Sequence, residues 1–172
     1  QVLVDYPGRG DDGAAACDPA MLYDEDTHTI WMIFNHTPAG IGLRASKPGK
    51  GFDEKGNRIL YGESGNCFTL DKDGFVYDAQ GNKTDITVDK KGAVWKDGNI
   101  LGNIYLKEGY LIEARTSFLQ AIKSEDDGLT WSDPIDLNPQ VKEEWMGFIG
   151  AGPGRGIQIK KGKYTGRLVF PI

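Results

Sequence analysis

The sequence lacks several features that would assign it to a specialised class of protein. It has only two cysteines, Cys17 and Cys67, and neither lies in a C-x-x-C pair or another metal-ligand spacing. No apolar run approaches the length of a membrane span, and the first residues lack the layout of a signal peptide. The net charge of −5, without runs of Lys and Arg, argues against a nucleic-acid partner. We expect the cysteines to be free, buried thiols, with a disulfide as the alternative.

Glycine, in contrast, is abundant. The 172 residues include 24 glycines, many of them in D-G and G-N dipeptides typical of tight turns. From residue 40 to residue 111, turn signals recur at short intervals between brief runs of β-branched and aromatic residues. This pattern predicts a meander of β-hairpins. Only residues 139–146 suggest a helix, a short one with Pro139 near its first turn.

Longer strands are predicted on either side of this segment. Met21–Tyr23 and Ile30–Phe34 are apolar and are joined by a polar turn, which predicts a hairpin. The second strand is apolar at nearly every position, which indicates burial on both faces. The sequence therefore predicts an all-β fold.

The stretch from residue 124 to residue 131 reads S-x-D-x-G-x-T-W, and each of these positions has a physical role in a hairpin turn. The short side chains of Ser124 and Asp126 can accept hydrogen bonds from backbone N–H groups and close the turn. Gly128 reaches a positive φ at low cost. Thr130 begins the next strand, and the ring of Trp131 can fold under the turn as an apolar plug.

This octapeptide resembles the aspartate box, a turn that recurs on the blades of sialidases (neuraminidases) and of some other β-propellers. Residues 147–158 and 166–172 are similar to the F-x-G-x-G-P-G-x-G-I-x-L…G-R-L-hydrophobic-P-hydrophobic run of bacterial sialidases. Residues 16–20 (A-C-D-P-A) also fit that family. In this family the aspartate box lies at the periphery, so its aspartates are expected to be structural.

The resemblance implies part of a six-bladed β-propeller that is interrupted by a small inserted β domain, as in large bacterial sialidases. We expect propeller segments at residues 1–39 and 112–172, the latter with the aspartate box, and the inserted domain at residues 40–111. Both ends of the sequence look cut within a blade.

The family implies hydrolysis of terminal α-linked sialic acid from glycoconjugates. Its members use a tyrosine nucleophile with a glutamate, an aspartate acid/base, and three arginines that bind the substrate carboxylate through their forked donors. None of these is matched here, so no catalytic residue is assigned and the fragment alone is expected to be inactive. Release of an anhydro sugar by intramolecular transfer stays open.

The resemblance also implies the partners and surroundings of the protein. No metal or organic cofactor is expected. The expected partners are sialylated glycoproteins and glycolipids and the remainder of the catalytic domain, without nucleic acid or a transmembrane segment. The expected location is secreted or at the bacterial cell surface.

Substrate contacts are implied for a few residues. Asp18 matches the position where relatives place an aspartate against the N-acetyl N–H of sialic acid, although a loop aspartate before a proline explains it as well. Other candidates have a structural alternative: a strand end for three of them, the core for Phe148, and glycine positioning for the Gly-rich run. These candidate residues are Cys17, which would line the acetyl pocket, Asn35, His36, Thr37, Phe148, Arg155 and Gln158.

Two other functions fit the sequence. One is a non-catalytic aspartate-box propeller. The other is a carbohydrate-binding module at residues 40–111, with Tyr77, Trp95 and Tyr105 as stacking platforms, although core packing explains these aromatic residues equally well. Asp71 begins a calcium-loop pattern, but Asn82 occupies the twelfth position that needs an acid, so a hairpin turn is predicted there.

Overall fold

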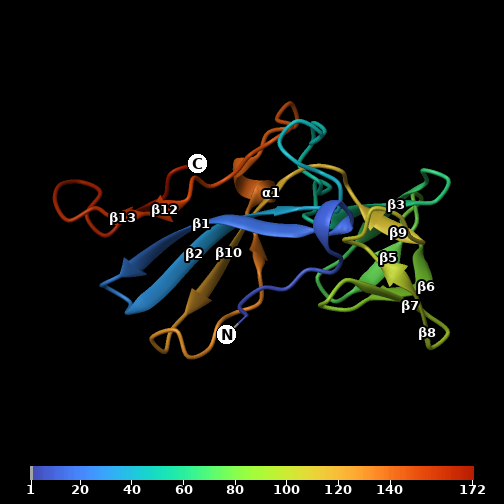
Figure 1. The fold of residues 1–172 in the computed structure, drawn as a ribbon, viewed down its shortest axis with the longest axis horizontal. Helices are drawn as coiled ribbons and strands as arrows, with labels where there is room; N and C mark the ends of the chain where they lie inside the picture. Colours follow the sequence, from blue (N-terminus) through green and yellow to red (C-terminus); the bar gives the residue numbers. More distant parts are fainter. Residues whose placement is uncertain (1) are drawn as a thin grey trace.

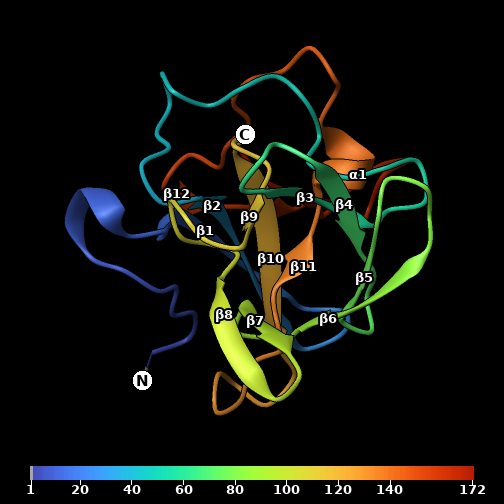
Figure 2. The same cartoon turned by 90° about the vertical axis from the view of Figure 1, so that its right-hand side faces the viewer.

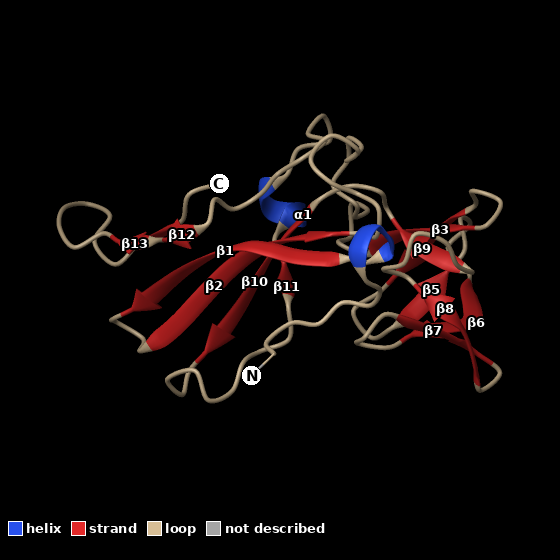
Figure 3. Cartoon of the chain, viewed as in Figure 1, coloured by secondary structure: helices blue, strands red, loops and turns tan. Residues whose placement is uncertain are grey.

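The computed structural model describes residues 2–172 and consists of β-strands with two very short helices (Figures 1 and 3). The predicted all-β class is confirmed. The helices are η1 (Gly10–Asp12) and α1 (Asn138–Val141), which is shorter than predicted. α1 ends because Lys142 is extended and buries its ammonium group, which donates to the carbonyl oxygens of Ser117 (3.0 Å) and Gly147 (3.1 Å). Burial lowers the pKa of Lys142 to about 8.

The first sheet has five strands in the order β11–β10–β2–β1–β12. β1 (Ala15–Asp24) and β2 (Thr29–Thr37) form the predicted apolar hairpin, and β10 (Phe118–Ser124) pairs with β2. β11 (Ile135–Asp136) closes one edge, and β12 (Gly154–Arg155) lies parallel to β1 at the other. Burial on both faces holds only for the second half of β2, since residues 30–32 are half-buried.

The second sheet has seven antiparallel strands in the order β8–β7–β6–β5–β4–β3–β9. β3 to β8 form a meander, as predicted from the turn signals, and β9 returns to pair with β3. Its core consists of aliphatic side chains, among them Leu60, Val76, Val94 and Leu111. Figure 2 shows this sheet toward the viewer, with β1, β2 and β10 behind it. The strands are β3 (Arg58–Gly62), β4 (Cys67–Leu70), β5 (Phe75–Tyr77), β6 (Lys83–Val88), β7 (Ala93–Lys96), β8 (Asn99–Asn103) and β9 (Leu111–Glu113). A separate hairpin joins β13 (Ile157–Gln158) to β14 (Leu168–Val169).

Four turns in residues 53–93 share one construction that the sequence reasoning missed. An aspartate three residues before the turn glycine uses its Oδ1 to accept two backbone N–H bonds, from the second and the fourth residue after it. In the Asp78 turn these bonds come from Gln80 (2.9 Å) and Asn82 (2.8 Å), and Gly81 has φ +82°. The four aspartates are Asp53, Asp71, Asp78 and Asp89. The turn at Asp71 joins β4 to β5, as predicted.

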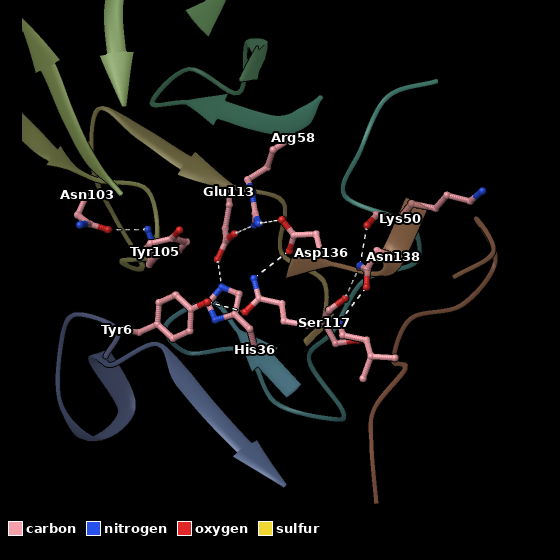
Figure 4. Close-up of polar contacts among 12 residues, drawn as sticks. Tyr6, His36, Lys50, Arg58, Asn103, Tyr105, Glu113, Ser117, Asp136 and Asn138 are labelled. Carbon is pink, nitrogen blue, oxygen red and sulfur yellow. Dashed lines mark hydrogen bonds and ion pairs between the residues drawn. The ribbon is translucent and has the colours of Figure 1, made fainter. Parts of the chain in front are cut away.

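The two sheets meet at a buried cluster of charged side chains, shown in Figure 4. The carboxylate of Glu113, which is 1% exposed, bonds to the guanidinium of Arg58 and to His36 Nε2 (2.5 Å). Arg58 Nη2 also donates to Asp136 Oδ2 at 2.6 Å. Burial disfavours the charge on Arg58, but Asp136 and Glu113 outweigh it and raise the pKa of Arg58. We call Arg58, His36, Glu113 and Asp136 the junction cluster.

Both ring nitrogens of His36 face oxygen atoms. Its Nδ1 faces the carbonyl oxygen of Ala15 at 3.2 Å and its Nε2 faces the Glu113 carboxylate. The ring thus bridges the Glu113 carboxylate and the Ala15 carbonyl, while the Arg58 guanidinium is shared between the Glu113 and Asp136 carboxylates. Aromatic rings surround these side chains: Tyr6 stacks on His36 at 4.0 Å, and Phe118 lies under Arg58.

Removing the guanidinium of Arg58 should therefore be costly. Arg58→Met leaves the buried Glu113 and the half-buried Asp136 without this cation, and we expect a loss of about 3–5 kcal/mol in the free energy of unfolding, measured with urea. The control is Lys90→Ala, which breaks a pair with Asp133 whose side chains are 86% and 71% exposed, and should cost less than about 1 kcal/mol. Equal losses of unfolding free energy in Arg58→Met and Lys90→Ala would contradict a buried cluster that depends on Arg58.

The aspartate turns predict a dependence of stability on pH. Hydrogen bonds, first from Asn82, lower the pKa of Asp78 below its ordinary value. A lowered pKa in the folded state gives stability that is complete above about pH 4 and is lost as pH falls through the folded pKa. Asp78→Asn keeps an Oδ1 acceptor without the ionisation, so its free energy of unfolding should fall less between pH 5 and pH 2. Urea unfolding curves that lose the same stability in both proteins would refute this.

Candidate functional site

β1 is interrupted at Asp18. The pairing register with β2 shifts between Cys17 and Ala20, and Asp18 has φ +52°. Pro19, which follows it, has no N–H to donate to the ladder, so a bulge at this point costs little pairing. Bulges re-aim side chains, and here the bulge leaves Asp18 exposed at the surface.

Asn35 holds the side chain of Asp18 in place through a hydrogen bond. It lies on β2 opposite Cys17 and is 1% exposed. Its Nδ2 donates to Asp18 Oδ2 (3.2 Å) and to the carbonyl of Ala151 (3.4 Å), while its Oδ1 accepts from the Ala151 N–H (2.6 Å). The amide of Asn35 thus uses both its donor and acceptor groups to tie the Asp18 carboxylate to the Gly-rich run.

Phe148 borders the same group of residues. A Cβ on Gly150 would lie 2.6 Å from the Phe148 ring and 2.8 Å from the Asn35 amide. Only glycine therefore allows the run to approach β2 so closely. Phe148 itself is half-buried. We call Asp18, Asn35, Phe148, Gly150 and Ala151 the Asp18 cluster.

His36 and Thr37 do not join the Asp18 cluster. Successive side chains on a strand point to opposite faces, and His36 turns into the junction cluster with no exposed surface. Thr37 is 7% exposed. The alternative of a solvated strand end is wrong, because all three residues from Asn35 to Thr37 are buried.

Cys17 adjoins Asp18 and is exposed. Both cysteines are free, as predicted, but neither is buried, so that part of the prediction is wrong. Cys17 precedes the bulge, and Cys67 lies on the outer face of β4 opposite Tyr61. Partial burial, and then the charge of Asp18, raise the pKa of the Cys17 thiol, which keeps it protonated and neutral.

Gln158 and Arg155 lie away from the Asp18 cluster. Gln158 Nε2 donates to Asp24 (2.8 Å) and Asp26 (2.9 Å), which pins β13 to the β1–β2 turn. That turn is at the other end of β1 from Asp18. Arg155 is exposed on β12, beside Met21. These contacts could not be predicted from the sequence, because the residues that meet are more than 130 positions apart.

The turn at residues 124–131 has the hydrogen bonds that its sequence suggests. Ser124 Oγ accepts from the Gly128 N–H (2.8 Å), and Asp126 accepts from the N–H (2.8 Å) and hydroxyl (2.6 Å) of Thr130. Gly128 has φ +85°, and Trp131 Nε1 donates to its carbonyl at 3.2 Å. Ser124 pairs with Ile30 and Leu119 with Asn35, so the turn lies roughly 17 Å along β10 from the Asp18 cluster.

The aromatic residues of the second sheet have structural partners. Tyr77 donates to Asp71 (3.0 Å) and Trp95 Nε1 donates to Asp89 (3.2 Å), so both brace aspartate turns. Tyr105 packs edge-on against His36, and burial raises its pKa to about 12. These contacts favour the packing explanation over free stacking platforms.

Residues 2–172 lack the features of a metal site and of a membrane-spanning helix. In that part of the chain, no group of three or more His, Cys, Asp or Glu side chains is arranged to hold a metal ion. No helix there has the length and apolarity that crossing a bilayer requires.

Comparison with known proteins identifies sialidases in both sequence and fold. An anhydrosialidase from Macrobdella decora is 29% identical over 191 residues, covering 92% of this chain and 25% of that protein. A sialidase from Bacteroides fragilis is 48% identical over 56 residues, covering 33% of this chain and 10% of that protein. The crystal structure of an intramolecular trans-sialidase from Ruminococcus gnavus, in complex with oseltamivir carboxylate, matches with a TM-score of 0.83 and 26% identity, over 97% of this chain and 42% of that chain.

No family model matches the sequence. The chain spans a quarter or less of the length of these curated relatives. It therefore matches one part of a sialidase, and the predicted fold class, part of a sialidase-like propeller, is confirmed.

The Asp18 cluster can be tested through its buried amide. Asn35→Ala removes one acceptor and two donors at a buried site, so we expect a loss of about 1–3 kcal/mol in the free energy of unfolding and faster hydrogen exchange at the Ala151 N–H. The control is Asn99→Ala, whose exposed side chain bonds only to the Asp97 carbonyl (3.2 Å) and should change little. Unchanged protection of the Ala151 amide in Asn35→Ala would show that Asn35 does not hold the Gly-rich run.

Proposed function

We propose that this chain is part of the catalytic domain of an exo-α-sialidase, a retaining glycoside hydrolase that removes terminal α-linked sialic acid from glycoproteins and glycolipids. The similarity to sialidases over nearly the whole chain supports this. The observation that carries it is the Asp18 cluster, in which a bulge exposes one carboxylate and a buried amide holds it.

In this proposal, the cluster binds the N-acetyl group of the sugar. The Asp18 carboxylate accepts the amide N–H, a charge-assisted hydrogen bond that also fixes the ring's orientation. The neutral thiol of Cys17 lines the space for the acetyl methyl group, and Phe148 supplies an apolar wall. Asn35 does not touch the sugar; it keeps Asp18 in place.

The groups that break the glycosidic bond are not assigned to this chain. The remainder of the catalytic domain would supply the nucleophile, the acid/base and the arginines, and no cofactor is proposed. We also propose the division into propeller segments (1–39 and 112–172) and an inserted domain (40–111), and a secreted or cell-surface location. The fragment alone is proposed to be inactive.

A second outcome of the same chemistry is intramolecular transfer, which releases an anhydro sugar instead of free sialic acid. Two of the similar proteins, from Macrobdella decora and Ruminococcus gnavus, carry the names anhydrosialidase and intramolecular trans-sialidase. Mass spectrometry of the released sugar would distinguish the two products, because the anhydro sugar lacks one water.

The test is release of 4-methylumbelliferone from its sialic acid conjugate by the proposed full-length sialidase and by this chain alone. We expect activity only in the full-length enzyme. There, Asp18→Ala should lower kcat/KM about tenfold or more, because it removes a hydrogen bond to a charged group. The control is Asp133→Ala, at an exposed surface pair.

Two results would contradict this proposal. Release by this chain alone would show that catalytic groups lie within it. An Asp18→Ala enzyme as active as the Asp133→Ala enzyme would show that Asp18 does not contact the substrate.

A further inference from the structure

A pocket of about 420 Å³ shares no residue with the Asp18 cluster. Its floor is the outer face of β3 and β9, and its rim is the loop at residues 47–51 together with Arg115 and Glu144. This volume is in the range of small-ligand sites, which are mostly apolar with a few placed polar groups.

The floor is apolar because of strand alternation. Ile59 and Tyr61 lie two residues apart on β3, and Ile112 pairs directly with Tyr61 on β9. The intervening Leu60 and the preceding Leu111 point to the other face, where both are fully buried in the core. The outer face therefore presents an aliphatic surface and one aromatic ring, that of Tyr61, which is 38% exposed.

The rim is positively charged. It carries Lys47, Lys50 and Arg115 against one acid, Glu144, which gives +3 − 1 = +2 in a chain whose net charge is −5. Within residues 2–172, none of these three cations forms an ion pair. Lys47 and Arg115 contact each other through their backbones, from the Lys47 N–H to the Arg115 carbonyl at 2.8 Å, and the Lys47 carbonyl also accepts from the Thr116 hydroxyl at 2.6 Å.

The guanidinium of Arg115 indicates which kind of ligand the pocket would bind. Arg115 is half-buried at the pocket rim, and among the described residues its five guanidinium donors have no hydrogen-bond partner. A planar guanidinium matches a carboxylate through two parallel hydrogen bonds. A sugar ring that carries a carboxylate could therefore pack its apolar face on Tyr61 while its carboxylate binds Arg115.

We propose that this pocket is a binding site for a carboxylate-bearing sugar, held by Arg115 and Tyr61 with Lys47 and Lys50 contributing charge. The site goes beyond the proposed catalytic function and does not depend on it. Both sialic acids and uronic acids carry the required chemistry.

The experiment is a titration of the ¹⁵N-labelled chain, followed by NMR, with four separate probes: N-acetylneuraminic acid, glucuronic acid, glucose and inorganic phosphate. We expect at least one of the two acids to shift the backbone amides of Gly49, Gly51, Tyr61 and Ile112. Glucose should not shift them, because it lacks a charge. Shifts at Asp18, Asn35 and Ala151 would report the Asp18 cluster separately, so failure of one site is distinguishable from failure of the other.

Variants then test the assignment of residues. Arg115→Gln should weaken binding at the pocket amides about tenfold, and Tyr61→Ala should weaken it with the charge intact. Lys161→Gln, in an exposed turn outside the pocket, is the matched charge control and should bind like the parent chain.

Three outcomes would overturn the proposal. The first is that neither acid shifts the pocket amides. The second is that phosphate shifts them as much as the acids do, which would indicate a general anion site. The third is that Arg115→Gln and Lys161→Gln bind the acids with equal affinity, which would show that Arg115 does not contact the ligand.

Discussion

The burial of the Glu113 carboxylate is the constraint on which the arrangement of both sheets depends. A buried carboxylate is tolerated only with hydrogen bonding and compensating charge. Glu113 receives its compensating charge from Arg58 and has hydrogen-bonding partners in Arg58 and His36. These partners come from different sheets, so the sheets must meet with β2, β3 and β9 in contact. Asp136 then pairs with the other side of the same guanidinium.

The same constraint extends to the surface. His36 is fixed in the junction cluster, and Asn35 is its neighbour on β2, pointing to the opposite face. Since the position of His36 fixes that of Asn35, and Asn35 holds Asp18 and the Gly-rich run, the charges between the sheets help to place an exposed carboxylate on the other side of β2. A change in the junction cluster would therefore affect the Asp18 cluster without touching it.

Local features of the fold could be predicted from the sequence, because hairpins and turns depend on residues close together. Gly128 and the apolar runs of β1 and β2 are examples. The directions of side chains could not be predicted. A strand alternates its faces, so the inward direction of His36 depends on Glu113, 77 residues later. The exposure of Cys17 likewise follows from a bulge that periodicity does not reveal. The hydrogen bonds of the four turn aspartates could not be predicted either, because they depend on the backbone path of each turn.

The most direct test is a crystal structure of the proposed full-length sialidase with a sialic acid analogue that it does not hydrolyse. We expect an Asp18 carboxylate oxygen within about 3 Å of the N-acetyl nitrogen, with the Asn35 amide still bonded to both Asp18 and Ala151. An analogue bound away from Asp18, or with its N-acetyl group contacting other residues, would contradict it.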